Sequence, residues 1–212
     1  MSIPKISDLV NDGKFVYFLG FLWADGWISK RDNSIEIVIV ESDFNELKDI
    51  FFNTINWNMY KKQRSVNKVS FGKPQIRINK SLPELKIFLL NNGYALKSGG
   101  SPKQILDKIP KDLHHYWWRG YFDGDGSIAI SKNGCKNLSF WSVIDQEWED
   151  LKNVMYSCQI KFNVYSYRRK CGCSSSLTVT NKNHILLFGK YIYPNLSYDF
   201  GLKRKFDKFL LL

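Results

Sequence analysis

The sequence predicts an α+β fold made of two similar repeats, and two observations support this fold class. A short motif occurs twice, at residues 18–28 and 118–128. After each copy, stretches with the alternation of strands are interleaved with stretches that have the spacing of amphipathic helices. Because such strands must bury one face, the pattern predicts sheets that are covered by helices on one side.

Each motif begins as an apolar helix that carries small residues four positions apart. These are Gly20 and Ala24 in the first copy, and Gly120 and Gly124 in the second. Residues at i and i+4 share one helix face, and small side chains there let two helix backbones approach closely. We therefore predict that the two motif helices pack against each other at the centre of the molecule.

Both motif helices are predicted to end on an aspartate followed by glycine. Asp25 and Asp125 are separated by 125 − 25 = 100 positions, and Gly26 and Gly126 follow them. Glycine suits the left-handed conformation that often ends a helix, so we predict this conformation at both glycines. A helix C-terminus carries partial negative charge, so a carboxylate there needs a cation. Two such ends side by side would offer the oxygen ligands that Mg²⁺ prefers.

Three other interpretations of these sequence features are weaker. An Asp-Gly pair alone is typical of a turn, but two copies with matched flanks make that reading insufficient. A calcium loop beginning at Asp123 fails, because Ile128 and Gly134 stand where the loop requires glycine and glutamate. Cys171 and Cys173 lack the spacing and the second ligand pair of a zinc site.

The elements predicted after each motif follow the same order in both repeats. In the first repeat they are a strand at 34–40, a helix at 43–55, two or three strands within 59–79 and a helix at 82–91. In the second they are strands at 127–131 and 138–143, a helix at 146–158, strands at 162–169 and 175–180, and a helix at 183–190. Each repeat is thus predicted to be αββαββα, with residues 1–97 as the first, 98–110 as the linker and 111–212 as the second.

The two motifs resemble the signature motifs of the single-chain LAGLIDADG homing endonucleases, over residues 18–26 and 118–126. Trp23 departs from the pattern where an acidic residue is common, whereas Asp123 keeps it. The resemblance implies two motif helices beneath a β-saddle that binds a long double-stranded DNA target. It also implies hydrolysis of one phosphodiester in each strand, across the minor groove, leaving short 3′ overhangs.

The resemblance further implies the cofactor and the roles of individual residues. Two or three Mg²⁺ ions are expected, with Mn²⁺ as a substitute and Ca²⁺ supporting binding without efficient cleavage. The implied metal ligands are Asp25 and Asp125, helped by the carbonyl groups of Ala24 and Gly124. Lys97 and Lys203 are expected to reach the active site as catalytic residues, with Arg204 and Lys205 as competitors for the second role. Glu41 and Asp145 are candidates to position the attacking water.

Charge and composition favour a nucleic-acid partner. The net charge is +11 and the pI is about 9.4, and no basic amphipathic membrane anchor is evident. Lysines in turns alone are typical of a solvated surface, but here the cations cluster on predicted strands of both repeats, as expected of a β surface that enters the major groove. The predicted DNA-binding residues are Lys30, Lys61, Lys62, Arg64, Lys68, Lys73, Gln75, Arg77, Lys132, Lys136, Tyr165, Tyr167, Arg168, Arg169 and Lys170.

The remaining expectations concern assembly, location and alternative functions. Because both carboxylates lie in one chain, we expect a monomer. No signal-peptide core or membrane-length apolar run is present, so a cytoplasmic or nucleoid-associated protein is expected. Abundant Lys, Asn, Ile, Phe and Tyr hint at a phage or organelle gene. One alternative is a group I intron maturase that binds RNA on the same scaffold, and another is a catalytically silent DNA-binding protein. Retention of both aspartates argues against the silent protein.

Overall fold

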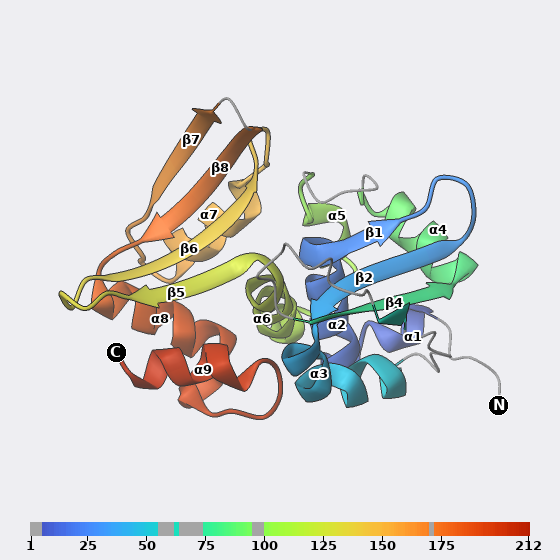
Figure 1. The fold of residues 1–212 in the computed structure, drawn as a ribbon, viewed down its shortest axis with the longest axis horizontal. Coiled ribbons are helices and arrows are strands. Elements are labelled where there is room, and N and C mark those ends of the chain that lie inside the picture. Colours follow the sequence, from blue (N-terminus) through green and yellow to red (C-terminus); the bar gives the residue numbers. More distant parts are fainter. Residues whose placement is uncertain (1–5, 55–61, 64–73, 95–99, 170–171) are drawn as a thin grey trace.

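Two four-stranded antiparallel sheets flank a central pair of helices, α2 and α6 (Figure 1). The computed structural model describes residues 6–54, 62–63, 74–94, 100–169 and 172–212. The strand order is β1-β2-β4-β3 in the N-terminal sheet and β5-β6-β8-β7 in the C-terminal sheet. The predicted α+β fold and the order αββαββα in each repeat are confirmed.

The N-terminal repeat is preceded by a short helix, α1 (Ile6–Leu9). Its elements are α2 (Gly13–Asp25), β1 (Gly26–Ile28), β2 (Ser34–Val40), α3 (Glu41–Thr54), β3 (Lys62–Gln63), β4 (Gln75–Ser81) and α4 (Pro83–Asn91). Asp12 caps α2 by accepting a hydrogen bond from the backbone N–H of Phe15 at 2.8 Å, which satisfies one of the free donors at that helix start.

The C-terminal repeat follows a connection that contains the short helix α5 (Lys103–Leu106) and a 3-10 turn (Lys111–Leu113). Its elements are α6 (His114–Asp125), β5 (Gly126–Ile130), β6 (Lys136–Val143), α7 (Glu149–Ser157), β7 (Asn163–Arg169), β8 (Gly172–Val179) and α8 (Lys182–Ile192). A second 3-10 turn (Pro194–Leu196) leads to a final helix, α9 (Lys203–Leu210).

Helices α2 and α6 touch backbone to backbone, as the small residues predict. A Cβ atom built on Gly20 would lie 2.0 Å from the carbonyl oxygen of Trp117. Reciprocally, a Cβ atom on Gly120 would lie 2.0 Å from the carbonyl oxygen of Tyr17. Any side chain at either position would force the helices apart, so the central packing depends on both glycines.

Each sheet has one face packed in the core and one open face. In the N-terminal sheet, Ile35, Ile37 and Ile39 of β2 are buried, as are Ile76 and Ile78 of β4. In the C-terminal sheet the buried set is Ile128, Leu138, Phe140, Leu177 and Val179. Since side chains alternate along a strand, the residues between them form the opposite surfaces, which we call the N-terminal and C-terminal open faces.

The structure differs from the sequence-based boundaries mainly before α7. The sequence predicts a helix from residue 146, and the preceding Asp145 would suit its N-cap, but α7 begins at Glu149 and has no side-chain cap. Asp145 instead lies exposed in the turn that follows β6. The buried side chains of Gln146 and Trp148 occupy the intervening segment, so burial of these side chains takes precedence over capping. Among the described residues, no helix combines the length and apolar character needed to cross a membrane.

Candidate active site between the motif helices

The C-terminal ends of α2 and α6 place Asp25 and Asp125 next to each other. A Cβ atom built on Gly124 would lie 2.4 Å from the Cβ of Ala24 and 3.6 Å from Oδ2 of Asp25. As a whole residue Asp25 is exposed and Asp125 is half-buried, but both carboxyl groups are crowded by the surrounding atoms at the helix ends. The four residues of the predicted metal site are therefore brought together from two parts of the chain.

The glycines after the aspartates do not have the predicted left-handed conformation. Gly26 has φ −80° and ψ 159°, and Gly126 has φ −85° and ψ 156°, so both continue directly into strands. Glycine is needed there for space, because a Cβ atom on Gly26 would lie 2.3 Å from the carbonyl oxygen of Leu22. On Gly126 it would lie 2.1 Å from Cδ2 of Phe122.

The carboxyl groups of this pair favour protonation in the metal-free protein. Burial, together with the neighbouring charge of Asp25, raises the pKa of Asp125 to about 8. Burial also raises the pKa of Asp25, with a smaller contribution from Asp43. Lys205 opposes both shifts. Because each shift reflects an unfavourable negative charge, added positive charge at this place would stabilise the ionised pair.

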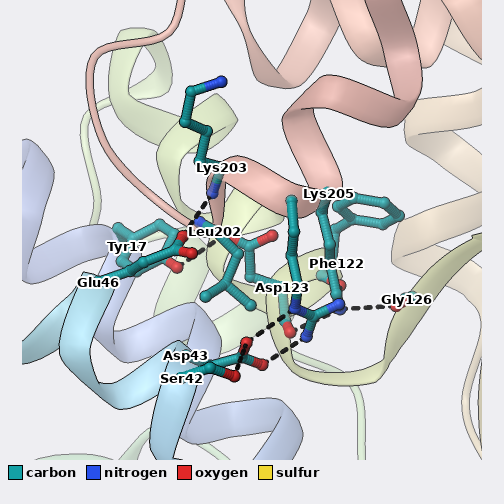
Figure 2. A network of polar contacts seen from close by, with 11 residues as sticks. Tyr17, Ser42, Asp43, Glu46, Phe122, Asp123, Gly126, Leu202, Lys203 and Lys205 are labelled. Atoms are coloured by element: carbon teal, nitrogen blue, oxygen red, sulfur yellow. Dashed lines mark hydrogen bonds and ion pairs between the residues drawn. The ribbon is translucent and has the colours of Figure 1, made fainter. Parts of the chain in front are cut away.

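Lys205 of α9 caps the end of α6 with its buried ammonium group. Its Nζ donates hydrogen bonds to the carbonyl oxygens of Phe122 at 2.8 Å, Asp123 at 2.6 Å and Gly126 at 2.6 Å (Figure 2). Burial lowers the pKa of Lys205 to about 8, against the attraction of Asp123 and Asp25. A cation here satisfies carbonyl groups that a helix end leaves free and offsets its partial negative charge.

Tyr94 occupies the corresponding place at the end of α2. Its hydroxyl donates to the carbonyl oxygen of Gly26 at 2.6 Å and lies 3.4 Å from that of Leu22. These carbonyls match those of Gly126 and Phe122 in the other repeat, at an offset of 126 − 26 = 100. Burial, followed by the charges of Asp125 and Asp25, raises the pKa of Tyr94. A neutral phenol thus caps one motif helix and a cation caps the other.

Asp123 fixes the start of the segment that carries Lys205. Its Oδ2 accepts hydrogen bonds from the Tyr17 hydroxyl at 2.7 Å and from the Leu202 backbone N–H at 2.8 Å. The carboxyl is buried, which raises its pKa to about 6 in spite of these donors and Lys205. Gly201, which precedes Leu202, has φ +115°, a conformation that favours glycine. The acidic residue that the second motif retains is therefore a positioning residue here.

Arg119, a charged residue inside the apolar motif helix, anchors the same segment. Its fully buried side chain donates from Nε to the carbonyl oxygen of Ile192 at 2.8 Å and forms an ion pair with Asp199. The guanidinium also lies 4.2 Å from the ring centre of Tyr193. Buried charges need partners, so an arginine within an apolar helix could have signalled such an anchor from the sequence.

Helix α9 also bonds to the N-terminal repeat through α3. The Nε atom of Arg204 donates to Oδ1 of the buried Asp43 at 2.7 Å, and its Nη2 pairs with Oδ2. The backbone N–H of Lys203 donates to Glu46 at 2.8 Å. Figure 2 shows Asp43, Glu46, Lys203 and Lys205 near one another, so this short helix contacts both α3 of the first repeat and the end of α6.

The described residues show the surroundings of only one of the two predicted catalytic lysines. Lys97 lies outside the described residues. Lys203 is exposed and its Nζ donates to Asp207 on the same helix, and its side chain extends away from Lys205 and Asp123 (Figure 2). Lys205, a competitor in the sequence analysis, is the lysine that faces the helix ends. The water-positioning roles of Glu41, at the start of α3, and of Asp145 stay predictions.

The predicted DNA-binding residues fall into three groups. Gln75 and Arg77 lie on β4, Lys30 in the turn after β1, Lys132 and Lys136 at the β5–β6 hairpin, and Tyr165, Tyr167 and Arg168 on β7. The side chains of Lys62 and Arg169 are not described, although both residues lie in strands. Lys61, Arg64, Lys68, Lys73 and Lys170 lie outside the described residues. No cluster of three or more His, Cys, Asp or Glu suited to a metal occurs among the described residues.

Comparisons with known proteins agree with this fold. Residues 112–193 match the family model described as LAGLIDADG-like domain. The homing endonuclease I-WcaI bound to its DNA recognition sequence has a TM-score of 0.59 and 15% identity, covering 96% of this chain and 91% of that one. The N-terminal LAGLIDADG domain of DUF199/WhiA has a TM-score of 0.57 and 16% identity, and the match covers 93% of this chain and 90% of that one. The LAGLIDADG homing endonuclease I-LtrWI, bound to target DNA, has a TM-score of 0.56 and 13% identity, and the match covers 97% of this chain and 89% of that one.

The fold and site thus define a two-repeat LAGLIDADG architecture. The predicted resemblance to the LAGLIDADG family is confirmed, and the second repeat contains the matched LAGLIDADG-like domain. At these identities, the solved structures establish the fold of the chain and not its activity. No curated protein matches the sequence.

Proposed function

We propose that this protein is a monomeric, divalent-metal-dependent endonuclease that cuts both strands of a long duplex DNA target. The observation that carries the proposal is the meeting of Asp25 and Asp125 at the ends of two interlocked helices. Neighbours with this fold include homing endonucleases bound to target DNA, and one of them was crystallised with DNA and Mn.

The residues of the site fit a divalent cation. Two carboxylates supply the hard oxygen ligands that Mg²⁺ and Mn²⁺ accept, and the raised pKa of each indicates that the pair needs positive charge. Both aspartates are therefore assigned as metal ligands. When bound, the cations would activate water and neutralise charge on the scissile phosphate.

The chain's own groups position this pair and bind the substrate. Lys205 holds the end of α6 and adds a fixed positive charge close to both carboxylates, while Tyr94 holds the end of α2. Arg77 on the N-terminal open face, and Lys132, Lys136 and Arg168 near the strand ends of the second repeat, are assigned to phosphate or base contacts. Such contacts release counterions, so DNA binding should weaken steeply as salt concentration rises.

A cleavage selection on randomised duplex DNA in Mg²⁺ tests the proposal. The selected target should be cut in both strands by the natural protein, whereas Asp25→Asn and Asp125→Asn should bind it and leave it uncut. Asp49→Asn, at an exposed position on α3, is the matched control and should cut normally. Cutting of both strands at the natural rate by either active-site variant would contradict the assignment.

Two other outcomes would favour the alternative functions. Specific duplex binding without cleavage in Mg²⁺ or Mn²⁺ would favour a catalytically silent DNA-binding protein. The N-terminal LAGLIDADG domain of DUF199/WhiA shares this fold. Tighter binding to a structured intron RNA than to any duplex DNA would favour the maturase.

A further inference from the structure

The two open faces carry different side chains at equivalent positions. On the N-terminal open face, Arg77 forms an ion pair with Glu36, with Nε and Oε1 3.2 Å apart, and Gln75 lies exposed on the same strand. The C-terminal open face is formed by alternate residues of its strands. Its described side chains at Ser127 and Ala129 of β5, from Asn137 to Val143 of β6 and from Asn163 to Tyr167 of β7 are uncharged.

An aromatic cluster, Trp141, Tyr165 and Tyr167, occupies the centre of the C-terminal open face. Trp141 of β6 and Tyr165 of β7 both pair with Ser176 of β8 in the sheet register. Trp141 is 43% exposed and Tyr165 is 45% exposed, whereas Ser176 is fully buried. The large rings therefore reach over the small residues of the middle strand and present apolar surface to solvent.

The geometry of the cluster favours contact with a duplex over stacking of unpaired bases. The rings of Trp141 and Tyr167 stack on each other, with centroids 5.3 Å apart and planes at 25°. One face of the Trp141 ring and one face of the Tyr167 ring therefore cover each other, whereas a platform for unpaired bases needs free ring faces. The exposed edges of the Trp141 and Tyr165 rings remain available to the floor of a major groove.

The chemistry of this face points to A·T base pairs. Guanine is read mainly by arginine or lysine, whereas the 5-methyl group of thymine is read by apolar contact. The exposed Asn163 lies one row from the cluster, opposite Thr178, and asparagine is suited to adenine. By contrast, the Arg77–Glu36 pair offers a donor for guanine and an acceptor for cytosine on the N-terminal open face.

We propose that the C-terminal open face reads an A·T-rich half-site, with the aromatic cluster packed against thymine methyl groups. This inference rests on the proposed function, because it takes duplex DNA as the ligand. The target is then asymmetric in composition, with any required G·C pairs concentrated in the half-site bound by the N-terminal sheet.

A binding experiment with Ca²⁺ tests the inference without requiring cleavage. Target duplexes are selected from a random pool, and each half-site is resynthesised with uracil in place of thymine, which removes only the methyl group. Uracil in the half-site of the C-terminal sheet should weaken binding about fourfold for each contacted methyl group. The same replacement in the other half-site should have little effect.

Variants assign each half-site to its sheet. Trp141→Ala should remove the uracil effect and relax selection in one half-site only, and Arg77→Gln should relax selection in the other. Tyr156→Ala is the control, because Tyr156 is 63% exposed on α7, away from both open faces. If Trp141→Ala fails to fold, the uracil comparison on the natural protein decides the question alone.

Equal uracil sensitivity of both half-sites, or G·C pairs selected opposite the cluster, would overturn the inference and leave the proposed function intact. Tighter binding of single strands than of any duplex would also overturn it. Failure to bind any duplex would overturn the proposed function itself.

Discussion

The ends of α2 and α6 have the same backbone but different caps. The carbonyl oxygen of Gly26 accepts from the hydroxyl of Tyr94, and that of Gly126 accepts from the ammonium of Lys205, both at 2.6 Å. The duplicated fold thus requires a donor at this point and not a particular charge. Backbone symmetry is therefore retained while the electrostatics of the site are asymmetric.

A similar difference separates the open faces. The N-terminal face carries the Arg77–Glu36 ion pair, and the C-terminal face carries the cluster around Trp141. The helix interface remains alike in both repeats, since Gly20 and Gly120 make equivalent contacts. The symmetry is kept where the repeats pack together and is lost on the surfaces available to a ligand.

The largest expected effect tests the packing of α2 against α6, which is alike in both repeats. Gly20→Ala and Gly120→Ala should each lower the free energy of unfolding by about 3 kcal/mol or more, because the added Cβ meets rigid backbone at 2.0 Å. The two costs should be similar. Gly134→Asn, in an open hairpin with φ +77°, is the control for denaturant unfolding. A loss below 1 kcal/mol in either helix variant would refute the described packing.

The next effect tests the cationic cap. Lys205→Met leaves three carbonyl groups at the end of α6 without their donor, which should cost about 3 kcal/mol. Lys203→Met removes only an exposed ion pair with Asp207 and should cost less than about 0.5 kcal/mol. Chemical denaturation of both variants gives the comparison, and equal stabilities would contradict the assigned cap.

A third effect concerns pH in metal-free solution. The pKa of Asp125 rises from 3.8 to about 8 on folding, so the folded state binds more protons between these values. Its stabilising contribution is complete below about pH 4 and is lost as the pH rises through 8. Asp125→Asn should therefore stabilise the protein relative to the natural chain at pH 8, and this advantage should shrink toward pH 4. If the pKa of Asp125 were not raised, unfolding curves in EDTA would show the same difference in stability between the variant and the natural chain at pH 4 and at pH 8.

The smallest expected effect tests the neutral cap. Tyr94→Phe removes the hydroxyl that bonds to Gly26 and keeps the ring against Trp23, so it should cost about 1 kcal/mol. It should therefore destabilise the protein less than Lys205→Met does. The reverse order in thermal or denaturant unfolding would contradict the assignment of Lys205 as the stronger cap.

The repeats, the helix pair and the meeting of two aspartates were predictable because local spacing encodes them. Gly20, Gly120 and the strand at 34–40 needed no distant information. The lysine that faces the site did not follow from spacing alone, because Asp123 fixes where α9 begins by binding Leu202. The roles of Tyr94 and Arg119 also depend on contacts far apart in the sequence. The exposure of Trp141 likewise depends on the register of its strand, which places its side chain on the open face.

Asp25 and Asp125 are proposed to form one divalent-cation site. Its most direct test is titration with Mn²⁺, followed by electron paramagnetic resonance, on the protein alone and on its complex with the selected duplex. We expect Mn²⁺ binding by the natural chain and by Asp49→Asn, and a loss of at least tenfold in affinity for both Asp25→Asn and Asp125→Asn. Unchanged Mn²⁺ affinity in either active-site variant would contradict it.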